Sequence, residues 1–215
     1  MGTLRRVDWA YRFRDPETLY LNVTNRCTNR CTFCVRARTP RLGDGLLAGG
    51  PEPKLDELLA AVDARGGAAS FREIVWCGYG EPTLRLDLIL AASPRFREAG
   101  ATVRLNTNGH ACLIHGRDVL PELGRVVDRV NVSLNAPSEA RYVELCRPDP
   151  SVASGVEPPP APGAFWHAML DFLARAPSHI GHVQASVVGG TLDPAEIERC
   201  RELAAELAGA PLRVR

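Results

Sequence analysis

The chain has 215 residues and a formal net charge of +1, and 45% of its residues are hydrophobic. This balance is typical of a soluble globular protein with one large domain, and it offers no general attraction for nucleic acid or lipid. No stretch approaches the roughly 20 apolar residues of a membrane span, and the N-terminus lacks a signal-peptide pattern. The seven cysteines are an odd number, which favours metal binding or catalysis over a disulfide framework. We therefore expect a cytoplasmic protein.

Arginine is concentrated in the N-terminal fifth of the chain. This enrichment fits either a solvated arginine-rich surface or a site for an anionic substrate, and the sequence favours neither. The residues concerned are Arg5, Arg6, Arg12, Arg14, Arg26, Arg30, Arg36, Arg38 and Arg41.

Short apolar and β-branched runs recur along the chain. Most are apolar on both faces, which favours buried parallel strands over half-exposed antiparallel ones. The predicted strands are 18–24, 73–77, 102–107, 129–134, 183–188 and 211–215.

Helical patterns lie between these runs. The last helix is the clearest, because Asp193 is a good N-cap, Glu196 completes a capping box and Gly209 ends the pattern. Ser138 is a good N-cap for an earlier helix. The predicted helices are 53–65, 85–99 with a break or kink near Pro94, about 115–124, 138–146, 163–175 and 194–208.

Strand and helix alternate about six times, which indicates a parallel sheet with helices outside it. A full eight-unit barrel typically needs about 250 residues, so this shorter chain favours an open barrel of six units. We predict an α/β fold, a partial (βα)6 barrel with parallel strands inside and helices outside, in a single domain over residues 1–215. Residues 1–17 are an N-terminal extension, residues 18–215 the partial barrel, and the proline-rich stretch 155–163 a loop or linker.

Three cysteines follow the first predicted strand closely. Cys27, Cys31 and Cys34 have the spacing C-x3-C-x2-C, and thiolates are ligands for zinc, copper(I) or iron–sulfur clusters. A zinc ribbon needs a second cysteine pair, and the other cysteines are scattered singly. Three thiolates on a four-iron cluster leave one iron open for a substrate or cofactor. The loop after a parallel strand lies on the active face of such folds.

This segment resembles the cluster motif of the radical S-adenosylmethionine (SAM) superfamily, in which an aromatic residue precedes the last cysteine. Phe33 stands in that position. The resemblance implies a [4Fe–4S] cluster held by the three cysteines, with SAM chelated on the open iron. Electron transfer then cleaves SAM to a 5′-deoxyadenosyl radical, which abstracts hydrogen from a substrate.

Two later segments extend the resemblance. GYGEPT, residues 78–83, resembles the family's GGEP motif, with Tyr79 in place of the second glycine. The resemblance implies that this backbone and Glu81 meet the SAM ammonium group, and Gly78 and Gly80 allow close approach to a ligand. LNTNG, residues 105–109, is similar to the family's TTNG segment; Asn106 is then a SAM contact and Asn108 shapes the turn.

The next two strands complete the pattern. VNVSLNA, residues 130–136, is similar to the family's VSLD element, and Ser133 and Asn135 are expected to share one face of a strand as SAM contacts. After the fifth strand, Val187 and Val188 are candidates to pack the adenine. The remaining cysteines are expected to be core residues, and His110 a satisfied loop histidine.

The phrase LYLNVTNRCTNRCTFCVR carries a closer likeness to the TatD nuclease-associated radical SAM proteins. The substrate is not identified by the sequence; a small molecule or nucleotide-like compound is one option, and an electron donor such as flavodoxin or ferredoxin is implied. An alternative is a glycyl-radical activating enzyme that acts on a partner protein. Two alternatives of another class are a non-catalytic iron–sulfur protein for electron transfer or sensing, and a zinc-binding interaction module.

Overall fold

The computed structural model describes residues 7–153 and 159–215. Its centre is a seven-stranded sheet in the order β1-β2-β5-β6-β7-β8-β9. The strands from β2 onward pair in parallel, and β1 pairs antiparallel with β2. The strands are β1 (Ala10–Phe13), β2 (Asp15–Leu21), β5 (Glu73–Trp76), β6 (Thr102–Thr107), β7 (Arg129–Ser133), β8 (His182–Val187) and β9 (Leu212–Val214).

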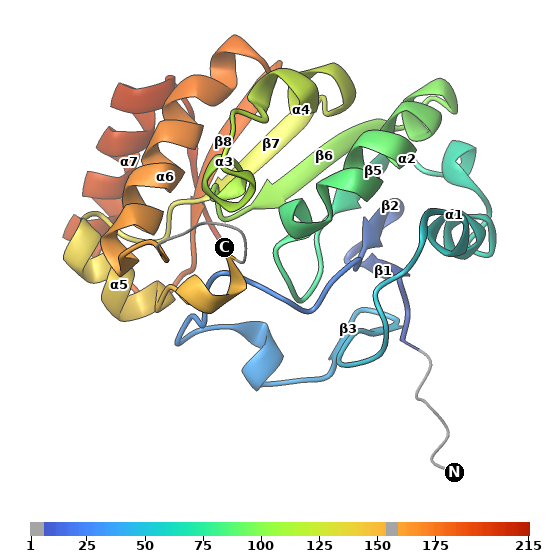
Figure 1. Ribbon diagram of the computed structural model, residues 1–215, viewed down its shortest axis with the longest axis horizontal. Helices are drawn as coiled ribbons and strands as arrows, with labels where there is room; N and C mark the ends of the chain where they lie inside the picture. Colours follow the sequence, from blue (N-terminus) through green and yellow to red (C-terminus); the bar gives the residue numbers. More distant parts are fainter. Residues whose placement is uncertain (1–6, 154–158) are drawn as a thin grey trace.

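Helices surround this sheet, with α1 near β1 and α7 near β9 (Figure 1). They are α1 (Leu55–Asp63), α2 (Leu86–Glu98), α3 (Ala111–His115), α4 (Leu120–Val126), α5 (Glu139–Cys146), α6 (Pro162–Arg175) and α7 (Pro194–Ala208). Short 3-10 turns are η1 (Val35–Ala37), η2 (Ala68–Ser70), η3 (Pro82–Arg85), η4 (Pro150–Val152) and η5 (Ala176–Ser178). The predicted α/β partial barrel, with parallel strands inside and helices outside, is confirmed.

Alternate strand residues form the core between sheet and helices. Ile74, Trp76, Val103, Leu105 and Val130 are almost fully buried in one hydrophobic cluster. Burial of each such side chain stabilises the fold by roughly 1.5–3 kcal/mol. Their strand neighbours point to the inner face of the sheet, where most side chains are polar.

Two predicted helices differ from the structure. The helix expected over about 115–124 is two helices, because Gly116 adopts a left-handed φ of 60° and ends α3. Pro121 then lies in the first turn of α4. The break expected near Pro94 is absent, since α2 runs through that residue. The predicted caps Ser138 and Asp193 both accept hydrogen bonds from their helices.

The N-terminal region contains strands that the sequence pattern did not predict. β1 lies inside the expected extension, and β2 begins at Asp15, earlier than the predicted start at residue 18. A second, two-stranded sheet pairs β3 (Arg41–Leu42) with β4 (Gly45–Leu46). The Gly43–Asp44 turn was the available signal for this hairpin. All six predicted strands are present as the parallel strands β2 and β5 to β9, joined by five helical connections. Residues 155–158 of the expected linker lie outside the described residues, and its end from Pro162 belongs to α6.

Candidate cluster and cofactor site

One cavity of about 360 Å³ lies at the carboxyl ends of β2, β5, β6, β7 and β8. Every site residue predicted from the sequence except Val187 lines it, although their roles as ligands and contacts stay predictions. These residues are Cys27, Phe33, Cys31, Cys34, Gly78, Tyr79, Gly80, Glu81, Asn106, Asn108, Ser133, Asn135 and Val188. The cavity is also lined by residues that were not predicted to form the site, namely Asn29, Val35, Cys77, Thr107 and Arg215.

Residues 22–36, here called the cysteine loop, lie against the C-terminal end of α5. The Thr32 amide donates to the Leu145 carbonyl at 2.9 Å, and the Arg30 amide donates to the Cys146 carbonyl at 3.0 Å. The last carbonyls of a helix have no partners within the helix, so these amides satisfy them. The loop that follows β2 is thereby tied to the helix that follows β7.

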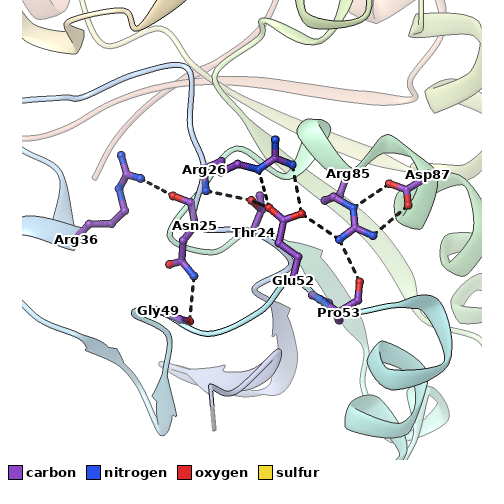
Figure 2. A network of polar contacts seen from close by, with 9 residues as sticks. All are labelled: Thr24, Asn25, Arg26, Arg36, Gly49, Glu52, Pro53, Arg85 and Asp87. Atoms are coloured by element: carbon purple, nitrogen blue, oxygen red, sulfur yellow. Dashed lines mark hydrogen bonds and ion pairs between the residues drawn. The ribbon is translucent and has the colours of Figure 1, made fainter. Parts of the chain in front are cut away.

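Arg36 fastens the cysteine loop to itself. Its guanidinium donates to the carbonyls of Asn25 at 2.7 Å and Asn29 at 3.1 Å, and its Nε lies 3.3 Å from Cys34 Sγ. The contact with Asn25 is drawn in Figure 2. The sequence does not mark this role, because Arg36 is one of many arginines near the N-terminus.

Charged residues hold the beginning of the loop, as Figure 2 shows. The Glu52 carboxylate accepts hydrogen bonds from the Thr24 hydroxyl and from Arg26, with the Arg26 Nε at 2.8 Å. Arg85, at the start of α2, donates to Glu52 at 3.4 Å and to the Pro53 carbonyl at 3.1 Å. We call Thr24, Arg26, Glu52 and Arg85 the Glu52 network.

A second set of contacts holds the middle of the loop and is fully buried. Asn108 donates to the Thr28 hydroxyl at 2.8 Å, and His110 lies 2.8 Å from both Thr28 Oγ1 and the Tyr142 hydroxyl. Asn29 donates to the same Tyr142 hydroxyl at 3.0 Å. Burial lowers the pKa of His110 to about 3, so the ring is neutral near pH 7. We call these five residues the buried network, and they confirm His110 as a satisfied loop histidine.

The Glu81 carboxylate is engaged inside the protein. It accepts from the amide and hydroxyl of Thr83, from the Thr107 hydroxyl at 2.7 Å and from the Asn108 amide at 2.7 Å. Burial raises the pKa of Glu81, and these hydrogen bonds oppose that rise. The carboxylate thus caps η3 and joins it to the end of β6. These contacts make Glu81 a cap of the η3 turn, and its contact with the SAM ammonium stays a prediction.

The two glycines of GYGEP are required by the cysteine loop. A Cβ atom at Gly78 would lie 2.2 Å from Asn22 Oδ1, and one at Gly80 would lie 2.2 Å from the Arg26 carbonyl. Any side chain at either position would therefore push the two loops apart. The close approach seen here is between two parts of the chain itself, and the contact of these glycines with a ligand stays a prediction.

The Tyr79 side chain is turned into a small separate core. It packs with Tyr11 and Leu47, and its hydroxyl donates to the Thr39 carbonyl. Its amide donates to Asn22 Oδ1 at 3.0 Å. A tyrosine is therefore tolerated at the position of the family's second glycine, because its side chain packs away from the cysteine loop.

The predicted polar contacts come from two strands. Asn106 Oδ1 accepts from Arg104 at 3.2 Å, and the Ser133 hydroxyl accepts from Arg215 at 3.2 Å. The expectation that Ser133 and Asn135 share a strand face is wrong, because β7 ends at Ser133 and Asn135 has a left-handed φ of 59°. Both residues still line the cavity.

The two candidate valines and the remaining cysteines differ in whether they line the cavity. Val188 lines the cavity, whereas Val187 is fully buried in the core and does not. Cys77, expected in the core, lines the cavity, and Cys200 is buried in α7 as expected. Cys112 is half-buried and lies outside the cavity.

The three loop thiols differ in their surroundings. Burial, and then the nearby Glu81 carboxylate, raise the pKa of Cys27 to about 12. A hydrogen bond from the Cys146 thiol lowers the pKa of Cys31. Metal ligation requires deprotonated thiols, so binding at Cys27 must displace its proton. Among the described residues, no three His, Cys, Asp or Glu side chains converge as a site for a metal ion.

Comparisons with known proteins identify the family. The family model of the radical SAM superfamily matches residues 21–204, and the chain belongs to this superfamily. The chain is 35% identical over 140 residues to GTP 3',8-cyclase 2 of Mycobacterium tuberculosis. The aligned region covers 63% of this chain and 36% of that protein. It is 36% identical over 133 residues to "Probable RNA methyltransferase sce1580" of Sorangium cellulosum, covering 58% of this chain and 31% of that one. The chain spans about a third of the length of these curated relatives.

Solved structures agree on the fold. Streptococcus suis SuiB bound to the precursor peptide SuiA matches with a TM-score of 0.61 and 13% identity, covering 93% of this chain and 39% of that one. TYW1 with a lysine-pyruvate adduct matches with a TM-score of 0.56 and 16% identity, covering 95% of this chain and 67% of that one. At these identities the likeness extends to the fold alone.

Membership defines the general chemistry. Radical SAM proteins are enzymes that bind a [4Fe–4S] cluster and SAM, and these are the cofactors of this chain. The closer likeness to TatD nuclease-associated proteins has no support among these relatives. Within the part of the chain that the structure describes, no helix is long and apolar enough to cross a membrane.

Proposed function

We propose that residues 1–215 form a single radical SAM core domain that holds a [4Fe–4S] cluster through Cys27, Cys31 and Cys34. The observation that carries this proposal is the shared cavity at the carboxyl ends of the parallel strands. Segments that resemble separate family motifs meet there. Their meeting is expected of a working site and not of independent chance matches.

The chemistry of the cavity fits both cofactors. The three thiols are soft donors suited to iron–sulfur ligation. Two side-chain oxygens in the cavity, Asn29 Oδ1 and Asn135 Oδ1, are buried and have no hydrogen-bond partner among the described residues. Buried acceptors are normally paired, so these two fit donor groups of SAM such as its ammonium and hydroxyls.

When bound, the reduced cluster would supply the electron that cleaves SAM and so generates the hydrogen-abstracting radical. The chain's own residues position SAM and shield the reacting groups. Phe33 and Val188 offer apolar contact, and Asn106 and Ser133 offer polar contact within the same cavity. An enclosed site also keeps water from the reacting groups.

For the substrate we propose a small molecule or nucleotide-like compound. The likeness to GTP 3',8-cyclases supports this class, and the near-neutral charge gives no support to long nucleic acids. A flavodoxin or ferredoxin is the proposed electron donor. The free cysteines of the chain suit a reducing compartment, and we propose the cytoplasm.

The test is anaerobic reconstitution with iron and sulfide, followed by SAM, dithionite and an assay for 5′-deoxyadenosine. We expect product from the wild type and from Cys112→Ala, whose thiol lies outside the cavity, and none from Cys31→Ala. Product that does not depend on Cys31 would contradict the proposal. Stoichiometric zinc without iron would instead favour a zinc module. An intact cluster whose EPR signal does not change when SAM is added would favour a non-catalytic iron–sulfur protein.

A further inference from the structure

A second cavity, of about 490 Å³, lies on the inner face of the sheet toward the amino ends of the strands. Its lining includes Glu73, Arg104, Arg129, Asn131, Gln184 and Arg213. They come from β5, β6, β7, β8 and β9. We call this space the arginine cavity, and none of its side chains has a role in the proposed cofactor site.

The arginine cavity lies next to the cofactor cavity along β6 and β7. Arg104 and Asn131 line it, whereas Asn106 and Ser133, two residues further along the same strands, line the cofactor cavity. Residues two apart on a strand share a face and lie roughly 7 Å apart. Arg104 also donates to Asn106 at 3.2 Å, at the boundary between the two cavities. The distance along the strands is short enough for one compound of modest size to contact residues of both cavities.

Positive charge dominates the arginine cavity. Glu73 is its one carboxylate, paired with Arg104 at 2.8 Å and with Arg129 at 3.9 Å. Arg213 has no ion pair among the described residues, and it lies in the same cavity. Arg104, Arg129 and Arg213 thus place three positive charges against the one negative charge of Glu73, an excess that an anion would neutralise.

Asn131 gives an independent sign of a ligand. It is 4% exposed, and its Nδ2 donates to the Ser186 hydroxyl at 3.0 Å. Its Oδ1 is buried without a partner among the described residues. Unpaired buried acceptors are rare in native proteins and call for a specific explanation. A ligand that brings a hydrogen-bond donor beside an anionic group would explain both Asn131 and the arginines.

We propose that the arginine cavity binds an anionic group of the substrate, a phosphate or a carboxylate, while the reacting carbon extends into the cofactor cavity. This inference rests on the proposed function for its placement of the reacting carbon. Arginine suits the role because its planar fork binds either oxyanion through two parallel hydrogen bonds.

The experiment is isothermal titration of the reconstituted, SAM-loaded protein with two probes, inorganic tripolyphosphate and tricarballylate. We expect saturable binding of at least one probe, which weakens as salt rises. Tighter binding of tripolyphosphate assigns a phosphate, and tighter binding of tricarballylate assigns a carboxylate. Arg213→Gln should weaken binding about tenfold, because one charged donor is removed.

A second variant, which is expected to bind the probes more tightly, separates loss of a contact from loss of the folded structure. Glu73→Gln removes the competing carboxylate and should tighten binding several-fold, which damage to the fold would not do. Arg199→Gln is the matched control, since Arg199 pairs with Glu202 on exposed α7. No saturable binding, or equal binding by Arg213→Gln and wild type, would overturn the inference.

The two proposals fail in different ways. Absence of 5′-deoxyadenosine from a cluster-loaded wild type would contradict the proposed function. Normal SAM cleavage without binding of either probe would overturn only the inference that the arginine cavity binds an anionic group.

Discussion

Two polar networks hold the cysteine loop, and they differ in charge and in burial. The Glu52 network is charged and partly exposed: 52% of the Arg26 side chain and 30% of the Glu52 side chain are accessible, whereas Thr24 is buried. The buried network is neutral, and all of its members are nearly inaccessible. Exposed ion pairs typically contribute about 0–1 kcal/mol. A buried hydrogen-bonding group that loses its partner costs more, roughly 1–3 kcal/mol.

The networks also act on different parts of the loop. The Glu52 network holds residues 24–26, before the first cysteine (Figure 2). The buried network holds Thr28 and Asn29, which lie between Cys27 and Cys31. We infer that the buried network sets the positions of the thiols, and that the charged network mainly sets where the loop begins.

The largest effect is expected for His110→Leu. Leucine fills a similar volume but removes one buried hydrogen bond from each of the Thr28 and Tyr142 hydroxyls, which keep only Asn108 and Asn29 as partners. We expect a loss of about 2–4 kcal/mol in the free energy of unfolding, since two groups are affected, and reduced iron content. Urea unfolding and iron analysis measure both. His167→Leu is the control, because His167 is exposed. Equal effects of the two variants would remove the distinction between the networks.

Lowering the pH should destabilise the folded chain through His110, a member of the same buried network. Its pKa is about 3 in the folded chain and near 6.5 when unfolded. The unfolded chain therefore binds the proton first as pH falls below 6.5, and stability is lost progressively down to pH 3. The loss approaches roughly 1.4 kcal/mol per pH unit, or about 2 kcal/mol at pH 5.

The pH measurement compares wild type with His110→Gln in urea at pH 7 and pH 5. Glu81 titrates with the opposite sign, because burial raises its pKa and acid favours its folded form. Glu81 is present in both proteins, so its contribution cancels in the difference. We expect the wild type to lose about 2 kcal/mol more than the variant. Parallel losses would show that His110 is not buried as a neutral ring.

Glu81→Gln should have a smaller effect. The amide keeps one oxygen for the Thr83 and Thr107 hydroxyls but turns an NH₂ group toward the Asn108 amide, which is also a donor. We expect a loss of about 1–2 kcal/mol in stability. Thermal unfolding measures it, with exposed Glu98→Gln as the control. An unchanged melting temperature would mean that Glu81 does not tie the two loops.

The gathering of the site residues could be predicted because it depends on local order in the sequence. Parallel strands alternate with helices, so their carboxyl ends meet at one edge whatever the details of packing. The spacing of Cys27, Cys31 and Cys34 and the order of the later motifs then sufficed to choose the lining of the cavity.

Side-chain directions could not be predicted in this way. Asn29 and Tyr142 meet across 113 positions of sequence, and no local pattern marks such a pair. Glu81 reads as a ligand contact in its motif, yet its partners come from the end of β6. The strand β1 was missed because its pairing with β2 depends on packing, whereas the hairpin of β3 and β4 had a turn signal at Gly43.

The smallest effect is expected for Glu52→Gln. The Gln side chain still accepts a hydrogen bond from Thr24 or Arg26, and only the charge is lost. We expect a loss below about 1 kcal/mol at low salt, and a smaller one in 1 M salt because screening already weakens the pairs. Glu122→Gln, which breaks the exposed pair with Arg117 far from the loop, is the control. Iron content should match wild type. A cluster lost from Glu52→Gln but kept in His110→Gln would reverse the assignment of the two networks.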